Sequence, residues 1–250
     1  MNVAEAVARS LAAHGVDHVF GVVGSGNFHV TNALIAAGAR YIAAVHEGGA
    51  ASMADAYARV SGRLCALSVH QGPGVTNALT GVVEAAKSRT PLIVLAPEAT
   101  SPRSNFFLDL PGLAVAIGAG FRRVTAARAA SDVADACRAA VAGAGQTVVL
   151  GLPLDVQAMP AGDAADLAQL ADLAQRAQIT DAADLAQLAD LAQRAQITGV
   201  AALAAREELG PLPELGPLLA ALAAARRPVF IAGRGATRRP AEARAQLTAL

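Results

Sequence analysis

The sequence lacks a net charge, a cysteine framework and any long hydrophobic run. Its 250 residues hold 20 lysine and arginine residues against 20 aspartate and glutamate residues. This balance gives the chain no net field to attract nucleic acid or an anionic membrane surface, so neither is an expected partner. The expected partners are small molecules and other protein chains.

Cysteine is scarce as well. Cys65 and Cys137 lie far apart and outside any CxxC or metal-ligand spacing, which is typical of buried apolar thiols in a reducing compartment. The longest uncharged apolar stretches, such as LPGLAVAIGAGF, are shorter than the ~20 residues that a membrane span needs. Glu5 and Arg9 interrupt the N-terminal apolar pattern, unlike a signal peptide. We therefore expect a cytoplasmic protein with no membrane partner.

Apolar residues make up 54% of the chain, enough for a sizeable core in one large or two smaller domains. Helical and extended patterns alternate along the first part of the chain. The helical patterns cover residues 3–14, 29–38, 47–62, 76–89 and 131–145, and the extended apolar runs cover residues 18–23, 40–46, 64–70, 91–97 and 147–156. Apolar strands that alternate with helices predict an α/β fold, a doubly wound parallel sheet with helices on both faces. We assign this domain to residues 1–157.

The character of the chain changes after this domain. Residues 163–180 recur without a difference as residues 181–198. The repeat of 18 residues equals five helical turns, so it keeps an apolar face in register, and we predict a helical linker over residues 158–215. Residues 216–250 read as helix then strand, the beginning of an incomplete second α/β domain. We expect an N-terminal portion of a longer protein, or a chain that partner chains complete.

Polar side chains follow three of the predicted strands at their carboxyl ends. Ser25 and Asn27 follow the first strand, Glu47 follows the second, and His70 and Gln71 follow the third. In open parallel sheets, ligands bind beyond the carboxyl ends of the strands. The sequence therefore predicts a binding site where these three loops meet.

Glu47 is the most informative of these residues, and two hypotheses account for it. Its negative charge could stabilise the N-terminus of the helix that follows. Alternatively, burial beside an apolar ligand would let this glutamate exchange a proton with the ligand near neutral pH. The next four residues, GGAA, are small and leave room for a ligand close to the backbone.

Two longer segments carry a family resemblance. HEGGAASMADAYAR and HQGPGVTNALTGVVEAAKSRTPLIVLAPE resemble the pyrimidine-binding domain of thiamine diphosphate enzymes of the acetolactate synthase and 2-keto acid decarboxylase superfamily. The resemblance covers about residues 2–157, and RRPVFIAGRGA resembles the opening of that family's central domain. It implies thiamine diphosphate as the cofactor, a 2-keto acid as the substrate and a homo-oligomer or a complementary subunit as the partner. It leaves open whether FAD binds.

The resemblance also implies roles for particular residues. Glu47 matches the glutamate that hydrogen-bonds the N1′ atom of the cofactor's aminopyrimidine and relays the proton that activates it. Gly24 and Gly26 match the loop over which the aminopyrimidine lies. Relatives commonly have a proline before the first glycine, whereas this chain has the sequence VVGSGN there. The family's GPG-x-x-N turn is matched by Gly72, Pro73, Gly74 and Asn77, which turn and capping chemistry alone would also explain.

Three hypotheses for the function remain open at this point. The GPGVTNALTG segment favours an acetolactate synthase-like carboligase, in which Gln71 would face the substrate. Ser25 and His70 favour a benzoylformate decarboxylase-like enzyme, in which the serine would hold the substrate carboxylate and the histidine would manage protons; the histidine could equally be structural. The chain also lacks the GDG motif through which relatives hold Mg²⁺ and the diphosphate, which favours a catalytically silent fragment or an accessory subunit.

Overall fold

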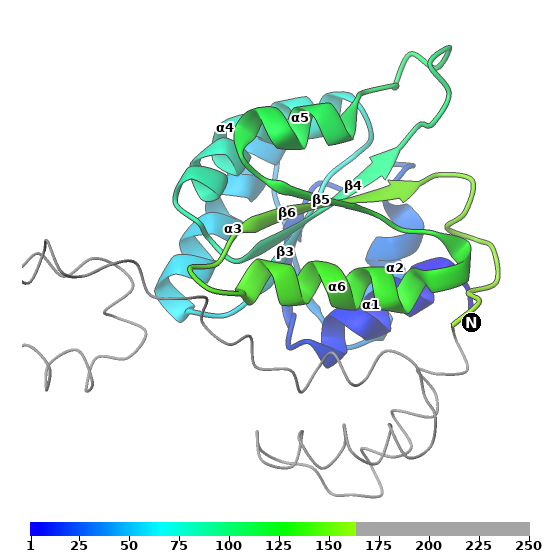
Figure 1. The fold of residues 1–250 in the computed structure, drawn as a ribbon, viewed down its shortest axis with the longest axis horizontal. Helices are drawn as coiled ribbons and strands as arrows, with labels where there is room; N and C mark the ends of the chain where they lie inside the picture. The colour runs from blue at the N-terminus through cyan, green and yellow to red at the C-terminus, as the bar shows by residue number, and fades with distance from the viewer. Residues whose placement is uncertain (164–250) are drawn as a thin grey trace, which may run out of the picture. The chain divides into compact units, whose positions relative to one another are not determined.

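Residues 1–163 are described here from a computed structural model (Figure 1). The remainder of the predicted linker and the predicted second domain, over residues 164–250, lie outside the described residues. The sheet consists of β1 (His18–Gly21), β2 (Arg40–Ala43), β3 (Cys65–Ser68), β4 (Leu92–Glu98), β5 (Gly120–Arg123) and β6 (Thr147–Pro153). The helices are α1 (Val3–Ala13), α2 (Phe28–Ala36), α3 (Glu47–Ser61), α4 (Pro73–Lys87), α5 (Leu110–Ile117), the short 3₁₀ helix η1 (Ala126–Arg128) and α6 (Ala129–Val141).

All neighbouring strands of the six-stranded sheet are parallel, in the order β2-β1-β3-β4-β6-β5. The chain starts near the middle of the sheet, moves to one edge through β2 and then returns to build the other half. This arrangement confirms the predicted α/β fold with a doubly wound parallel sheet. It also places β2, β1 and β3 side by side, so the loops that follow them share one end of the sheet.

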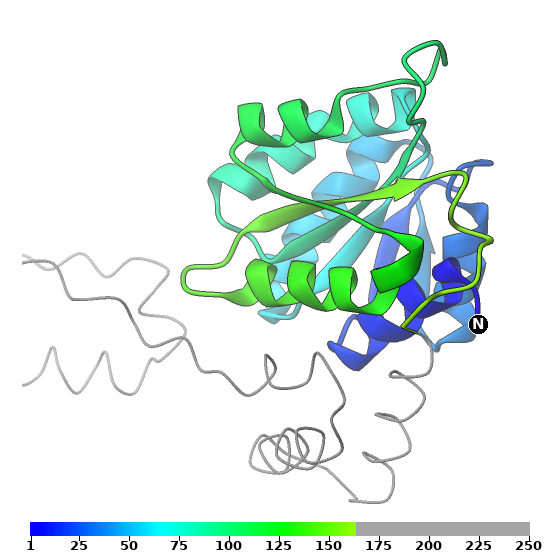
Figure 2. The ribbon, with the colours of Figure 1, turned by 45° about the vertical axis from the view of Figure 1, so that its right-hand side comes forward.

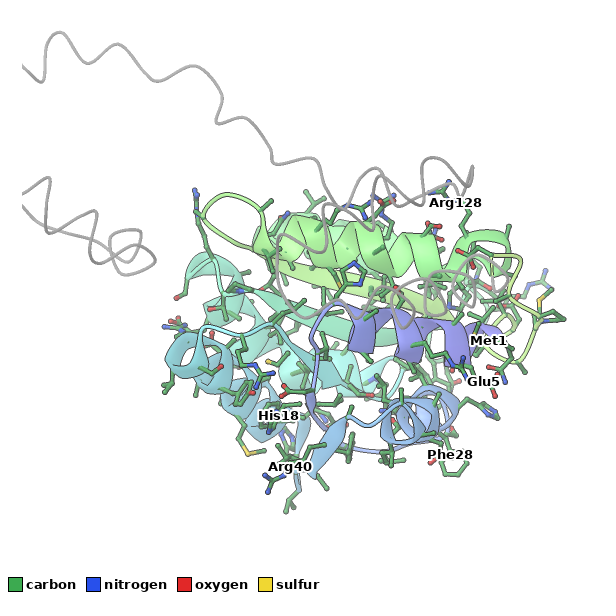
Figure 3. The ribbon with its side chains drawn as sticks, turned by 90° about the horizontal axis from the view of Figure 1, so that it is seen from below. Met1, Glu5, His18, Phe28, Arg40 and Arg128 are labelled. Carbon is green, nitrogen blue, oxygen red and sulfur yellow. The ribbon has the colours of Figure 1, made fainter. Side chains whose placement is uncertain are left out.

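Helices cover both faces of the sheet (Figures 1 and 2). One apolar core lies between the sheet and α1, α2 and α6, and a second core lies between the sheet and α3, α4 and α5. Figure 3 looks onto the first of these faces and shows α1 between α2 and α6. The middle strands are buried along their whole length, because both of their faces are covered, which explains their uninterrupted apolar sequences.

The second core is built largely of alanine, and this brings α3 and α4 close together. Gly81 of α4 lies against Ala51 of α3, where a Cβ atom on the glycine would sit 2.6 Å from the alanine Cβ. A larger side chain at either position would push the helices apart. Their close contact fixes the position of the N-terminus of α3 relative to the first turns of α4, which together carry part of the predicted site.

Two elements were missing from the sequence prediction, α5 and β5. The strand β5 has only four residues, lies at an edge of the sheet and is only partly buried, so it has no long apolar run. In α5, Pro111 and Gly112 are the second and third residues. The helix carries apolar residues on all sides, and one of them, Val115, is exposed. Neither segment shows the periodicity on which the prediction depended. Within residues 1–163 no helix combines the length and the hydropathy that a membrane span requires.

Candidate functional site

The predicted site residues gather at the carboxyl end of the sheet. The register of β1 with β2 and with β3 aligns the ends of the three strands, because Gly21 pairs with Ala43 and with Ser68. The loops that leave these strands therefore begin at the same level. They bring the glycine loop after β1, the start of α3 and the turn before α4 into contact.

Glu47 is the first residue of α3, and its side chain is only 8% exposed. Asn77 of α4 donates a hydrogen bond from Nδ2 to Oε2 of the glutamate at 3.1 Å. Among residues 1–163, none donates a hydrogen bond to the second oxygen, Oε1. A Cβ atom on Gly74 would lie 3.0 Å from Oε1, so the glycine keeps the space beside this oxygen free of a side chain. The carboxylate is thus fixed through one oxygen and unpaired at the other.

The start of α3 also fits the helix-terminus hypothesis for Glu47. His46 is the N-cap residue, and its Nδ1 atom accepts a hydrogen bond from the backbone N–H of Gly48 at 3.0 Å. A carboxylate in the first turn interacts favourably with the helix dipole. The two hypotheses are therefore compatible, since the same position gives the acid a favourable helix terminus and an unpaired oxygen.

The loop after β1 is shaped by Asn27, which is fully buried. Its Oδ1 atom accepts a hydrogen bond from the N–H of Gly24 at 2.7 Å. Its Nδ2 atom donates to the Val22 carbonyl at 3.0 Å and to the Ser68 hydroxyl at 2.9 Å. Asn27 therefore braces the loop. Ser25 lies exposed at the tip of the loop.

His70 lies against this loop, edge-on to the Phe106 ring at a centroid distance of 5.7 Å. The N–H of Gly26 approaches the Nδ1 atom of His70 at 3.4 Å. A Cβ atom on Gly24 would lie 2.5 Å from the same nitrogen. The imidazole can lie flat against the loop only because Gly24 has no side chain.

Gln71 is turned inward and is 5% exposed. Its Oε1 atom occupies the place that a side chain on Gly26 would need, 1.6 Å from the position of such a Cβ atom. Within the described residues this oxygen has no hydrogen-bond partner. Gln71, which the sequence predicts to face the substrate, therefore packs against Gly26 of the glycine loop.

The residues of the GPG-x-x-N turn have different roles. Gly72 has a φ of +60° and lies against the Phe106 backbone, where a Cβ atom would be 3.1 Å from the carbonyl oxygen. Pro73 begins α4, where the missing N–H costs no helical hydrogen bond. Turn chemistry thus explains Gly72 and Pro73, whereas Asn77 hydrogen-bonds Glu47 and Gly74 leaves no room for a side chain beside Oε1 of Glu47.

Sequence reasoning missed three residues of this region: Gln157, Phe106 and His46. Gln157 follows β6 and donates a hydrogen bond to the carbonyl of Gly26 at 3.0 Å. Its position after a strand of the same parallel sheet was the one signal that could have identified it. Phe106 belongs to the long loop between β4 and α5, for which the sequence offers no periodicity.

The two cysteines lie in the apolar cores and are free thiols. Burial, reinforced by the negative charges of Asp55 and Asp17, raises the pKa of Cys65 to about 12. Burial likewise raises the pKa of Cys137 to about 12, against a smaller opposing effect of Arg138. Both thiols stay protonated at neutral pH, which agrees with the prediction of buried apolar thiols. Within residues 1–163 no three histidine, cysteine or acidic side chains are grouped so that they could hold a metal ion.

Comparison with known proteins agrees with this geometry. Residues 1–110 match the family described as "Thiamine pyrophosphate enzyme, N-terminal TPP binding domain". A stretch of 101 residues, 40% of this chain, is 38% identical to sulfoacetaldehyde acetyltransferase of Rhodobacter capsulatus and covers 17% of that protein. A stretch of 99 residues, 39% of this chain, is 38% identical to the acetolactate synthase large subunit of Buchnera aphidicola and covers 17% of it. The N-terminal part of the chain, residues 1–110, is thus similar to the N-terminal domain of thiamine pyrophosphate enzymes.

A solved structure shows the same fold. The thiamine diphosphate-dependent 4-hydroxybenzoylformate decarboxylase of Rhodococcus jostii superposes with a TM-score of 0.60 at 23% identity, over 72% of this chain and 38% of that one. The matched region spans about one sixth of the length of the two curated relatives. The residues that the resemblance assigned to the aminopyrimidine side of the site lie on the loops after β1 and β3 and in the first turns of α3 and α4.

Proposed function

We propose that this chain supplies the aminopyrimidine-binding part of a thiamine diphosphate site in an enzyme that acts on 2-keto acids. The Glu47 carboxylate is the observation that carries the proposal. It is nearly buried, held by Asn77 at Oε2 and unpaired at Oε1 within the described residues. A carboxylate with one oxygen paired to Asn77 and the other without a protein donor among the described residues suits a planar heterocycle with a ring nitrogen.

Thiamine diphosphate, when bound, supplies an electron sink for bond cleavage next to a carbonyl group. The residues of this chain would contribute orientation and one proton. Glu47 would hold or release a proton at Oε1, while Asn77 donates its hydrogen bond to Oε2. The backbone of Gly24 and Gly26 would form the surface beside the ring, as the family resemblance implies, while His70 and Gln71 fill the places of their missing side chains.

An acetolactate synthase-like carboligase is the activity that we favour. The segment GPGVTNALTG supports it, since its glycine, proline and asparagine positions coincide with the turn that contacts Glu47. The name of the Buchnera aphidicola relative supports the same assignment. The name of the Rhodobacter capsulatus relative shows that an acetyltransferase also belongs among the relatives of this chain.

A decarboxylase remains the second candidate, and the environment of His70 favours it. If Nδ1 accepts the N–H of Gly26, the neutral ring carries its proton on Nε2. That proton could then be donated to a substrate-derived group at the edge of the sheet. The exposed hydroxyl of Ser25, on the same loop, would be available for a substrate carboxylate.

The test of the proposed function is the exchange of the C2 hydrogen of thiamine diphosphate with deuterated solvent. It is measured by NMR with this chain and with the complete product of its gene. The substitution Glu47→Gln is expected to lower the exchange rate by about 100-fold or more, in line with the usual size of acid–base contributions. Glu84→Gln is the matched control, because Glu84 is an exposed carboxylate on the later part of α4.

Two results would decide against the proposal. An unchanged exchange rate in Glu47→Gln would remove the assigned role of the acid. Absence of any accelerated exchange in the unmodified protein, in both forms, would favour the accessory or silent subunit. Product analysis with pyruvate and benzoylformate then separates the two enzyme activities, because acetolactate indicates carboligation and free aldehyde indicates simple decarboxylation.

A further inference from the structure

Gln157 lies after β6, at the same end of the sheet as the candidate site, and is only 2% exposed. Its Nε2 atom donates to the carbonyl oxygen of Gly26 at 3.0 Å and approaches the Leu152 carbonyl at 3.4 Å. Its Oε1 atom is buried without a hydrogen-bond partner among the described residues. Gln157 is thus 131 residues away in sequence from the loop that it holds.

Gly26 is contacted on its other sides as well. Its N–H faces Nδ1 of His70 at 3.4 Å, and the amide oxygen of Gln71 fills the place of its missing side chain. The Cβ atom of Pro97 lies 3.2 Å from that same place. With Gln157 on its carbonyl, the backbone of Gly26 is contacted at both its N–H and its C=O, on the two peptide units that flank its Cα atom.

The unpaired oxygen of Gln157 shows that packing is not the reason for an amide at this position. A buried polar atom without a partner is unfavourable, and an apolar side chain of similar size would fill the space without that cost. The feature that only an amide adds is the N–H donor to Gly26. Loss of this donor would leave the carbonyl of Gly26 buried and unpaired, so the loop would have to turn to reach another donor or solvent.

We propose that Gln157 is a positioning residue that sets the orientation of the Gly26 peptide and, through it, the position of the His70 imidazole. It acts through the glycine loop and does not itself touch a reacting group. The catalytic consequence rests on the proposed function, whereas the coupling from Gln157 to His70 does not.

The coupling is tested without any ligand, on the full chain labelled with ¹⁵N at histidine. The chain has five histidines, so the imidazole signals can be assigned by single replacements. Gln157→Met keeps the length of the side chain and removes the donor, and Gln157→Glu keeps the shape and replaces the donor with an acceptor. We expect both to move the imidazole signals of His70 by more than one linewidth.

Gln146→Met is the matched control, because Gln146 is a partly buried glutamine whose Nε2 donates to the Ala139 carbonyl at 3.1 Å, before β6 begins. It should leave the signals of His70 in place. His14, which precedes β1, and His18, the first residue of β1, lie at the other end of this strand and should keep their signals in the Gln157 variants. An unchanged His70 signal in a folded Gln157→Met protein would show that the glutamine only packs, and it would overturn the proposal.

A measurement on the unmodified chain covers the case in which the Gln157 variants do not fold. The side-chain amide protons of Gln157 should exchange with solvent much more slowly than those of Gln146. Equally fast exchange would show that the bond to Gly26 is absent and would also overturn the proposal. Both readouts are independent of thiamine diphosphate, so failure of the Glu47 experiment and failure of this one are distinguishable.

Discussion

Two groups of polar side chains, at opposite ends of the parallel sheet, differ in how fully they are paired. At the amino end, Asp17 accepts from His18 at 2.8 Å and from Arg63 at 2.7 Å, and the Tyr57 hydroxyl lies 2.9 Å from Nδ1 of His18. The Tyr57 ring also stacks on the imidazole at a centroid distance of 4.6 Å. Figure 3 shows His18 beside Arg40, the first residue of β2, with which it pairs in the sheet. The polar side chains of this cluster therefore find their hydrogen-bond and ion-pair partners within the cluster.

At the carboxyl end, Gln71 and Gln157 each keep a buried oxygen that is unpaired within the described residues, and Oε1 of the nearby Glu47 accepts no hydrogen bond from these residues. Such atoms are uncommon in folded proteins because they cost free energy. The helix α3 spans both ends, with Tyr57 in the paired cluster and Glu47 at the unpaired one. The Asp17 cluster thus stabilises the fold through its own pairs, whereas Glu47, Gln71 and Gln157 leave acceptors that a ligand could use.

The largest expected effect on stability is at Gly74. A Cβ atom there would lie 2.9 Å from the Cβ atom of His70 and 3.0 Å from Oε1 of Glu47, so Gly74→Ala should force the site apart. Overpacking of this kind costs about 1–3 kcal/mol. Urea unfolding of the full chain measures it. Gly49→Ala is the control, since nothing lies within 4 Å of its added Cβ atom, and we expect that variant to be as stable as the unmodified chain or more stable. Equal stability of the two variants would contradict the crowded geometry.

A second effect concerns α6, whose N-terminus lies at the carboxyl end of the sheet and is capped from a distant part of the chain. Asp163 accepts hydrogen bonds from the N–H groups of Ala130 and Ser131 at 3.2 Å and 2.9 Å, at the start of α6. Asp163→Ala should cost about 1 kcal/mol, the usual effect of losing an N-cap side chain. In urea unfolding, the free energy of unfolding of Asp163→Asn should lie between those of Asp163→Ala and the unmodified chain, because the amide keeps an acceptor and loses the charge. An unaffected Asp163→Ala variant would mean that this cap does not contribute.

The sequence was sufficient to predict the central strands of the sheet but not its edge strand β5. The buried strands β3, β4 and β6 are continuous apolar runs, and their periodicity against the intervening helices implied the parallel sheet. The strand β5 ends in Arg122 and Arg123, and Arg123 is placed by an ion pair with the buried Glu98. A short edge strand whose last residue forms an ion pair with a distant residue has no local apolar pattern from which it could be predicted.

The candidate site was predictable to the level of its loops. Residues that follow parallel strands must meet at one end, so Glu47 and His70 could be placed together from topology alone. The family resemblance, and not spacing, supplied the match to an aminopyrimidine site. The supporting contacts were out of reach, because Asn77 to Glu47 and Gln157 to Gly26 each join elements whose relative rotation depends on packing. Close packing of α3 on α4 decides the first of these contacts.

The smallest effect is expected at the paired end, and it carries a pH signature. Burial opposes ionisation of Asp17, but the hydrogen bond from His18, the charges of His18 and Arg63 and the hydrogen bond from Tyr57 together lower the pKa of Asp17 below its ordinary 3.8. A lowered pKa means that the cluster stabilises the fold fully above the pKa of the unfolded chain and loses this contribution as the pH falls through the folded value.

Asp17→Asn should therefore lower the free energy of unfolding at pH 7, by about 0.2–1 kcal/mol for so exposed a group. Urea titrations of both proteins should show the difference narrowing in acid, because the unmodified aspartate is then protonated as well. Glu47→Gln, measured in parallel at pH 7, should change stability less than Asp17→Asn, because no cation pairs with Glu47 within residues 1–163. If Glu47→Gln proved the more damaging of the two, the carboxyl end would be holding the fold together, and the division between the two ends would have to be abandoned.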